Sequence, residues 1–252
     1  MKKYLTLLTY LATAHLGGLV CLMVFRLCFF FSLHSALAAE TTSAWPAFLR
    51  GLWMDNVIGS YILLLPLLVV LVAQLCGRGG KGLLRFLNIW MGGFYALAFA
   101  AAAANIPFYN YFNQPLNSTI WQWAAYPSQT VGMLFGEATW WKYIALWAVV
   151  TAVYAYGLFR WRRYFGHRLP AFPKNWRERG VSLALWLPIA GLCVLGARGR
   201  LGYNPIKISA AYYCDNADLN NLGLNATFNL LNSTLDDARK ENRPLQLMDE
   251  NS

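Results

Sequence analysis

The chain alternates between long runs of apolar residues and short stretches in which the charged residues gather. Five of the runs reach about 20 residues, the length that a helix needs to cross a hydrocarbon core of about 30 Å. The pattern therefore predicts an all-α integral membrane protein with five transmembrane helices. We expect these spans at about residues 4–31, 57–76, 83–106, 141–159 and 181–197.

The predicted third connection, residues 107–140, contains no Lys or Arg and is rich in aromatic residues. A connection of this length normally has structure of its own, so we expect a re-entrant or interfacial segment with a short helix near Ile120. Two roles are open for it. It is either a lid that seals the bundle or an outer lipid-facing platform built on Asn117, Trp121 and Trp123.

The tail, residues 198–252, is more polar than the rest of the chain. Between positions 219 and 230, Leu and Phe recur at helical spacing, which predicts an amphipathic helix, and we expect the tail to consist of interfacial juxtamembrane helices on the outer face followed by a linker. Asp215, Asn216 or Asp218 is expected to start the amphipathic helix. Ser233 followed by Asp236 gives a weak second start signal.

Lys and Arg gather at one side of the predicted bundle. The second and fourth connections are strongly basic, whereas the first carries only Arg50 and the third has no Lys or Arg. Short basic loops face the cytoplasm. We therefore expect a cytoplasmic N-terminus and an extracytoplasmic tail, and we read the basic loop 160–168 as a topology determinant and anionic-lipid anchor.

The first apolar run could instead be a signal peptide, because Lys2 and Lys3 precede it and Ala36-Leu37-Ala38 resembles a cleavage site. A signal peptide has an apolar core of only about 7–15 residues. The run is longer than that, which favours an uncleaved span.

Composition agrees with a membrane protein. Hydrophobic residues make up 58% of the chain and charged residues 13%, against about 25% charged in a soluble domain. The net charge of +10 does not indicate a nucleic-acid binder, because the basic residues lie in short loops. The five Cys show no CxxC or Cys/His spacing, so we expect neither a metal site nor a disulfide framework.

Few ionisable groups lie within the spans. Arg26 and Asp55 are predicted at similar depths near the outer surface, and we expect an interhelical ion pair that fixes packing, with a lipid-headgroup contact as the alternative. His15 is the lone candidate for a functional ionisable group near the middle of the bilayer. We expect it instead to be a packing residue whose ring nitrogens are hydrogen-bonded to other helices. The chain has no P-loop, GxSxG or HExxH motif and no clustered carboxylates, so we expect no catalytic residues in it.

Several motifs together resemble a known family. They are GLWMDNVIGSYILLLPLL (Gly51–Leu68), FYNYFNQPLNSTIW, YPSQTVGMLFGE, RGRLGYNPIKIS and LNNLGLNATFNLL. This order resembles the N-terminal membrane domain of the lipoteichoic acid synthase-like phosphoglycerol transferases of the sulfatase and alkaline phosphatase superfamily. The residues that carry the likeness most are Asp55, Asn117, Asn220, Asn225 and Phe228. Ala226 departs from it, since the family tends to have Pro there.

The resemblance implies a bacterial cytoplasmic membrane location and a role as the anchor of a cell-envelope transferase. Such an enzyme moves an alcohol phosphate, phosphoglycerol or similar, from a membrane phospholipid to an envelope acceptor. Its catalytic domain, which uses a Thr nucleophile and a divalent metal, usually manganese, would begin beyond Ser252. Whether this chain belongs to an enzyme stays open, because it carries none of those catalytic or metal residues.

Two other functions remain possible from the sequence. One is a non-enzymatic membrane scaffold or pseudoenzyme remnant that holds partners on its outer face. The weaker one is a small transporter, which the nearly uncharged span interiors disfavour.

Overall fold

The structure, a computed structural model, describes residues 2–124, 126, 138–167 and 172–239. Over these residues every regular element is helical, and five helices are long and apolar enough to cross a membrane. They are α1 (Lys2–Ser32), α2 (Trp45–Cys76), α3 (Lys81–Phe112), α6 (Ala138–Gly166) and α7 (Trp176–Arg198). The predicted all-α class with five apolar spans is confirmed.

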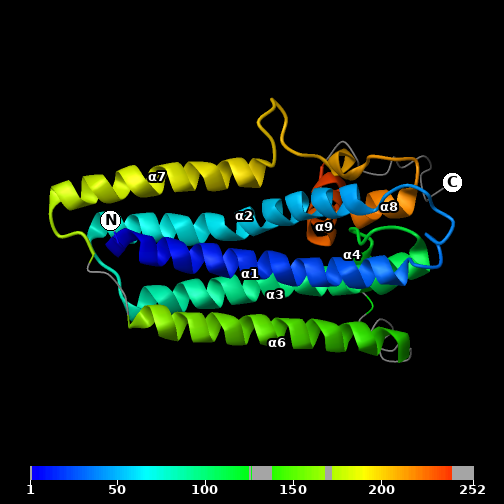
Figure 1. Ribbon diagram of the computed structural model, residues 1–252, viewed down its shortest axis with the longest axis horizontal. Coiled ribbons are helices and arrows are strands. Elements are labelled where there is room, and N and C mark those ends of the chain that lie inside the picture. The colour runs from blue at the N-terminus through cyan, green and yellow to red at the C-terminus, as the bar shows by residue number, and fades with distance from the viewer. Residues whose placement is uncertain (1, 125, 127–137, 168–171, 240–252) are drawn as a thin grey trace, which may run out of the picture.

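The five long helices run alongside one another in one bundle (Figure 1). α7 packs on α2 and α6 packs on α3, while α1 contacts α2, α3 and α6. The basic connections that join α2 to α3 and α6 to α7 lie at the same end of the bundle as the N-terminus. We call this the basic end and the opposite one, on which the tail packs, the outer end, a name that refers to the bundle and not to a side of a membrane.

Several helices are longer than the predicted spans. α2 begins at Trp45 rather than near 57, with Pro46 in its first turn, a position where Pro is favoured. α3 continues through Pro107 to Phe112. Each of these 32-residue helices is about 48 Å long, well beyond a hydrocarbon core of about 30 Å. Their extra turns stand at the outer end and provide a surface on which the tail packs.

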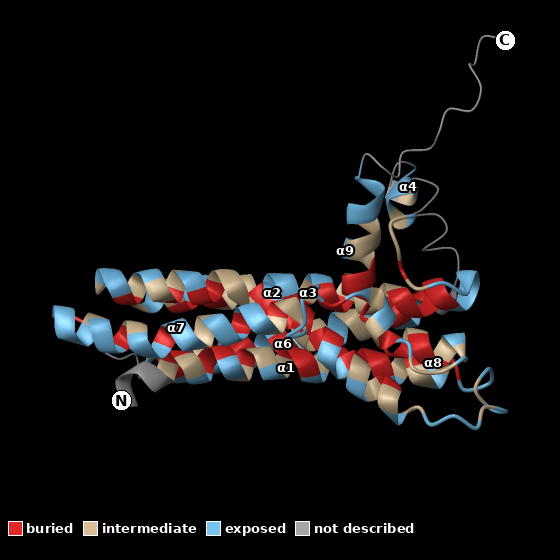
Figure 2. Cartoon of the chain, turned by 90° about the horizontal axis from the view of Figure 1, so that it is seen from above, coloured by how far each residue is buried: buried red, intermediate tan, exposed pale blue. Residues whose placement is uncertain are grey.

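Among the described residues, four short helices lie at the outer end: α4 (Ile120–Ala124), the 3₁₀ helix η1 (Ile208–Ala211), α8 (Ala217–Leu222) and α9 (Ala226–Asp237). Figure 2 shows α9 and α4 standing out sideways from the long helices. The described part of the tail thus forms two α-helices, and Asn216, one of the predicted start residues, is the N-cap of the first. The weak start signal at Ser233 is wrong, because Ser233 lies inside α9.

The tail shares its hydrophobic core with the bundle. One cluster of buried side chains joins residues of α1, α2, α3 and α6 to residues that come after α7. The tail contributes Ile206, Ala211, Leu224 and Phe228 to this cluster. The segment after the last long helix is therefore part of one packed unit and is not a separate appendage.

Candidate functional site

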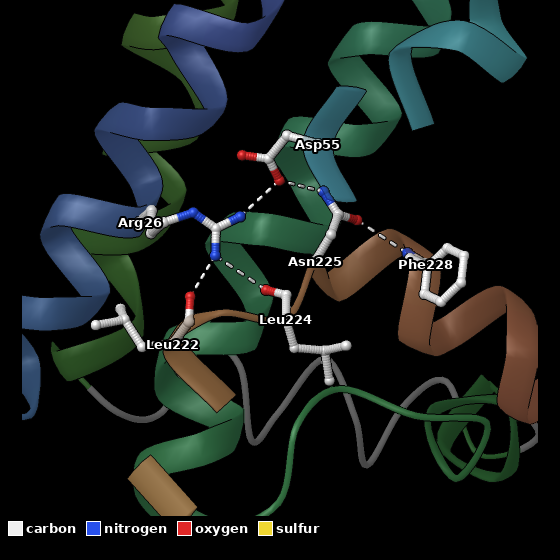
Figure 3. A network of polar contacts seen from close by, with 6 residues as sticks. All are labelled: Arg26, Asp55, Leu222, Leu224, Asn225 and Phe228. Carbon is white, nitrogen blue, oxygen red and sulfur yellow. Dashed lines mark hydrogen bonds and ion pairs between the residues drawn. The ribbon is translucent and has the colours of Figure 1, made fainter. Parts of the chain in front are cut away.

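A buried polar site joins α1, α2 and the tail (Figure 3). Arg26 Nη2 donates to Asp55 Oδ1 at 2.6 Å, and the two side chains are only 6% and 1% exposed. An ion pair removed from water in this way is strongly destabilised if one partner is lost, because the other charge is left uncompensated.

The tail supplies the other partners of this pair. Arg26 Nη1 donates to the carbonyl oxygen of Leu224 at 3.1 Å and also to that of Leu222. Asn225 Nδ2 donates to Asp55 Oδ1 at 2.7 Å. Arg26 and Asp55 therefore bind the backbone and one side chain of the segment that connects α8 to α9. We call these five residues, Arg26, Asp55, Leu222, Leu224 and Asn225, the tail lock.

Local sequence explains why the tail offers these groups. α8 ends at Leu222, and the last carbonyls of a helix have no partner within it. Asn225 is the N-cap of α9, and its Oδ1 accepts from Phe228 N at 2.9 Å. The same amide thus starts α9 with its oxygen and binds Asp55 with its nitrogen. The break between the two helices is the feature that exposes the carbonyls to Arg26.

Gly51 makes room for the Arg26 guanidinium. A Cβ atom at position 51 would lie 2.2 Å from Arg26 Cζ, which is closer than any van der Waals contact. Gly51 is one turn before Asp55 on the same helix, so a side chain there would push Arg26 off its partner. No pattern in the sequence indicated this role.

A small cavity of about 30 Å³ borders the tail lock. It is lined by Leu22, Phe25, Arg26, Phe29, Asp55, Ala102, Asn105, Leu224, Asn225 and Ala226. Arg26 Nε and Asp55 Oδ2 are buried and have no hydrogen-bond partner among the described residues. A cavity of this size with polar lining accommodates one water molecule and is too small for a lipid or a substrate. The site is thus suited to holding the tail on the bundle rather than to catalysis.

Asn220, the third tail residue singled out by the sequence, organises the turn before α8. Its Oδ1 accepts from Tyr213 N at 2.9 Å, and its Nδ2 donates to the Cys214 carbonyl at 2.7 Å. Phe228 is 5% exposed and packs in the shared core. Among the described residues, no hydrogen bond joins either side chain to Arg26 or Asp55. Asn220 and Phe228 therefore stabilise the tail itself, which the tail lock holds.

The proposed platform residues lie away from the tail lock, on α4 and just before it. Asn117 Oδ1 accepts from Thr119 N at 3.0 Å, and Trp121 Nε1 donates to Thr234 Oγ1 on α9 at 2.8 Å. The Trp123 ring packs against Phe108 and Phe112 with centroids 5.6 and 5.4 Å apart. α4 therefore packs against α9 and the end of α3. Residues 127–137 of the predicted third connection lie outside the described residues.

A second polar cluster occupies the middle of the bundle. His15 Nδ1 is 2.8 Å from Tyr95 Oη, and His15 Nε2 is 3.1 Å from Asn56 Oδ1. Both ring nitrogens thus have partners on neighbouring helices, as expected of a packing residue. The sequence reading missed Asn56 and Tyr95, although polar residues within apolar runs were the available signal.

Outside the spans, Glu40 fixes the connection between α1 and α2 to the tail. Its carboxylate accepts from Thr42 N at 2.9 Å and from Asn216, the N-cap of α8. Hydrogen bonds lower the pKa of Glu40 to about 2, with the larger contribution from Thr42 and a smaller one from Asn216. The carboxylate form therefore favours this contact.

The described residues contain no group of three or more His, Cys, Asp or Glu side chains that could hold a metal ion. Comparisons with protein-family models, curated proteins and solved structures find no match for the chain.

Proposed function

We propose that this chain is the membrane-anchoring domain of a cell-envelope transferase. Its partner on this proposal is a catalytic domain that comes after the tail and moves an alcohol phosphate from a membrane phospholipid to an envelope acceptor. The substrate class comes from the family resemblance. The anchoring role is supported by the packing of the tail.

The observation that carries the proposal is the tail lock. Arg26 and Asp55 are buried within the bundle, yet three of their four hydrogen bonds involve the segment between α8 and α9. A charge pair that only stabilised the spans would have no need of these groups. An anchor does, because it must hold the segment after the last span at a fixed height.

Further contacts hold the tail along the outer end. Arg50 Nη1 donates to the Ala210 carbonyl at 2.5 Å, and Trp53 Nε1 donates to the Gly199 carbonyl at 2.6 Å. Tyr109 Oη donates to Asp218 Oδ1 at 2.6 Å. A domain attached to a tail fixed in this way stays near the lipid headgroups, which raises the effective concentration of a membrane-bound donor.

The orientation belongs to the same proposal. More than half of the chain's 21 Lys and Arg lie in the N-terminus and in the two connections at the basic end. By the positive-inside rule this end faces the cytoplasm of a bacterial inner membrane. α8, α9 and the segment after them then lie on the extracytoplasmic surface.

The test is the intact mass of the gene product from native membranes, read together with the coding sequence beyond codon 252. The proposal expects a product well above the 28.4 kDa of this chain, which continues into a segment with a Thr nucleophile and His/Asp metal ligands. A native product of 28.4 kDa would rule out the anchor of a covalently attached enzyme.

A scaffold without an enzyme is the second candidate, and one observation favours it. The sideways pair α4 and α9 exposes Trp121, Leu231 and Leu235, which are 55%, 50% and 62% exposed. A partner or the headgroup layer could cover these side chains. A native 28.4 kDa product that copurifies with a stoichiometric partner, and loses it in Leu231→Ser/Leu235→Ser, would favour the scaffold.

A further inference from the structure

The charged residues that line a cavity at the basic end are all basic. It lies between the start of α3 and the end of α6, has a volume of about 190 Å³, and is lined by Lys81, Leu84, Arg162, Arg163, Gly166 and His167. Neither of the two ion pairs found among the described residues involves these side chains. The cavity is large enough for a phosphate group together with water.

The surrounding sequence offers almost no carboxylate to neutralise this charge. Glu178 is the single acidic residue in the two basic connections, residues 77–85 and 160–179. Its Oε2 accepts from Lys174 N at 2.9 Å. The cations that line the cavity therefore depend on a ligand or on bulk ions for neutralisation.

The arginines are also held in place. The guanidinium carbons of Arg162 and Arg163 lie 5.6 and 5.0 Å from the Phe159 ring centroid. Arg162 Nε is buried and has no hydrogen-bond partner among the described residues. A phosphate oxygen is the acceptor that a guanidinium binds best, because donor and acceptor are both charged.

The position of the cavity favours a lipid over a soluble ligand. It lies at the ends of two helices that are long and apolar enough to cross a membrane, and the ends of such helices reach the headgroup layer. The exposed rings of Trp161 and Tyr164, which flank the lining residues Arg162 and Arg163 in the sequence, stack with centroids 5.9 Å apart, and such aromatics mark the membrane interface. Leu84 supplies the apolar part of the lining.

We propose that this cavity binds the phosphate headgroup of an anionic phospholipid in the leaflet at the basic end. Basic pockets between transmembrane helices on the cytoplasmic side are a known way of holding such headgroups. The site lies at the opposite end of the bundle from the tail lock and does not depend on the transferase proposal. It gives the basic connections a defined ligand in addition to their role in topology.

The experiment is a titration of the purified full chain in neutral detergent, with bound lipid counted by native mass spectrometry. The probes are a short-chain phosphatidic acid, a phosphatidylcholine with the same chains, and inorganic phosphate as competitor. The test variant is Lys81→Gln/Arg163→Gln. The matched control, Arg85→Gln/Arg160→Gln, removes the same charge from the same two helices, at exposed positions outside the lining.

We expect one phosphatidic acid per chain in the wild type and the control, with much weaker binding of phosphatidylcholine. The test variant should bind phosphatidic acid roughly tenfold more weakly or worse, since each cation near an anionic headgroup contributes appreciably. Equal weakening in both variants would overturn the proposal and leave a diffuse surface charge. Displacement by inorganic phosphate at equal concentration would overturn it in favour of a soluble phosphate ligand. Unchanged thermal unfolding of both variants without lipid verifies that they are folded.

Discussion

Asp55 Oδ1 accepts a hydrogen bond of 2.7 Å from Asn225 Nδ2, although the two residues are 170 positions apart in the chain. The same oxygen accepts from Arg26 at 2.6 Å. One atom of α2 thus connects α1 to the tail, which comes after all five long helices. Perturbation of this atom should affect the bundle and the tail together.

Replacement of Asp55 by Asn should destabilise the protein strongly. The variant leaves the Arg26 guanidinium buried with no counter-charge, and loss of one partner of a buried pair costs about 3–5 kcal/mol. The measurement is unfolding in detergent, followed by Trp fluorescence. Asp215→Asn is the control, because Asp215 is an exposed tail carboxylate. Equal stability of the two variants would contradict the role of the ion pair.

A methyl group at position 51 should also destabilise the protein by disturbing the ion pair between Arg26 and Asp55. Gly51→Ala places Cβ 2.2 Å from Arg26 Cζ, so the guanidinium must move away from Asp55. We expect a loss of about 1–3 kcal/mol in unfolding free energy, as for other overpacked sites. Gly93→Ala in α3 is the control, because a Cβ there meets nothing within 4 Å. If Gly51→Ala were as stable as Gly93→Ala, the close packing on Arg26 would be wrong.

Two Asn residues allow the buried contact to be separated from simple helix capping. Asn225 caps α9 and donates to the buried Asp55, whereas Asn216 caps α8 and donates to Glu40. Asn216→Ala should cost about 1 kcal/mol, the usual value of a cap. Asn225→Ala should cost roughly 2–4 kcal/mol, because it also removes a hydrogen bond to a buried charge. Chemical denaturation of both variants provides the comparison, and similar losses would count against the tail lock.

Acid should weaken the contact between Glu40 and the tail. Hydrogen bonds from Thr42 and Asn216 lower the pKa of Glu40 from 4.5 to about 2. A lowered carboxyl pKa stabilises the folded state above about 4.5, and this contribution is lost as pH falls toward 2. Thermal unfolding between pH 6 and 2.5 should therefore be less pH-dependent in Glu40→Gln than in the wild type. Parallel profiles for the two proteins would show that the contact does not form.

The proposed orientation can be tested with single-cysteine proteins. Cys76 is exposed at the basic end of α2, and Leu201, in the tail just after α7, is 87% exposed. A membrane-impermeant maleimide applied to intact cells should label a Leu201→Cys protein that has no other Cys. A protein with Cys76 alone should react only after lysis. Labelling of Cys76 in intact cells would reverse the proposed topology.

The five apolar helices, and Arg26 and Asp55 as candidate partners, could be predicted from the sequence. The length of an apolar run and the charged residues within it can be read directly along the chain. The early start of α2 was missed, although Pro46 was a signal for it. The tail carbonyls of Leu222 and Leu224 could not be predicted, because every residue has a carbonyl and only the fold decides which ones face Arg26. The need for Gly51 likewise emerges only when Arg26 is placed above it.

Hydrogen exchange in lipid nanodiscs tests the central claim most directly, namely that Arg26 and Asp55 hold the tail on the bundle. The amides of α8 and α9 should be protected in the wild type and in Asp215→Asn. In Asp55→Asn they should exchange much faster, while the apolar middle of α2 stays protected. Equal protection of α8 and α9 in all three proteins would contradict the claim, because the tail would then be held without the lock.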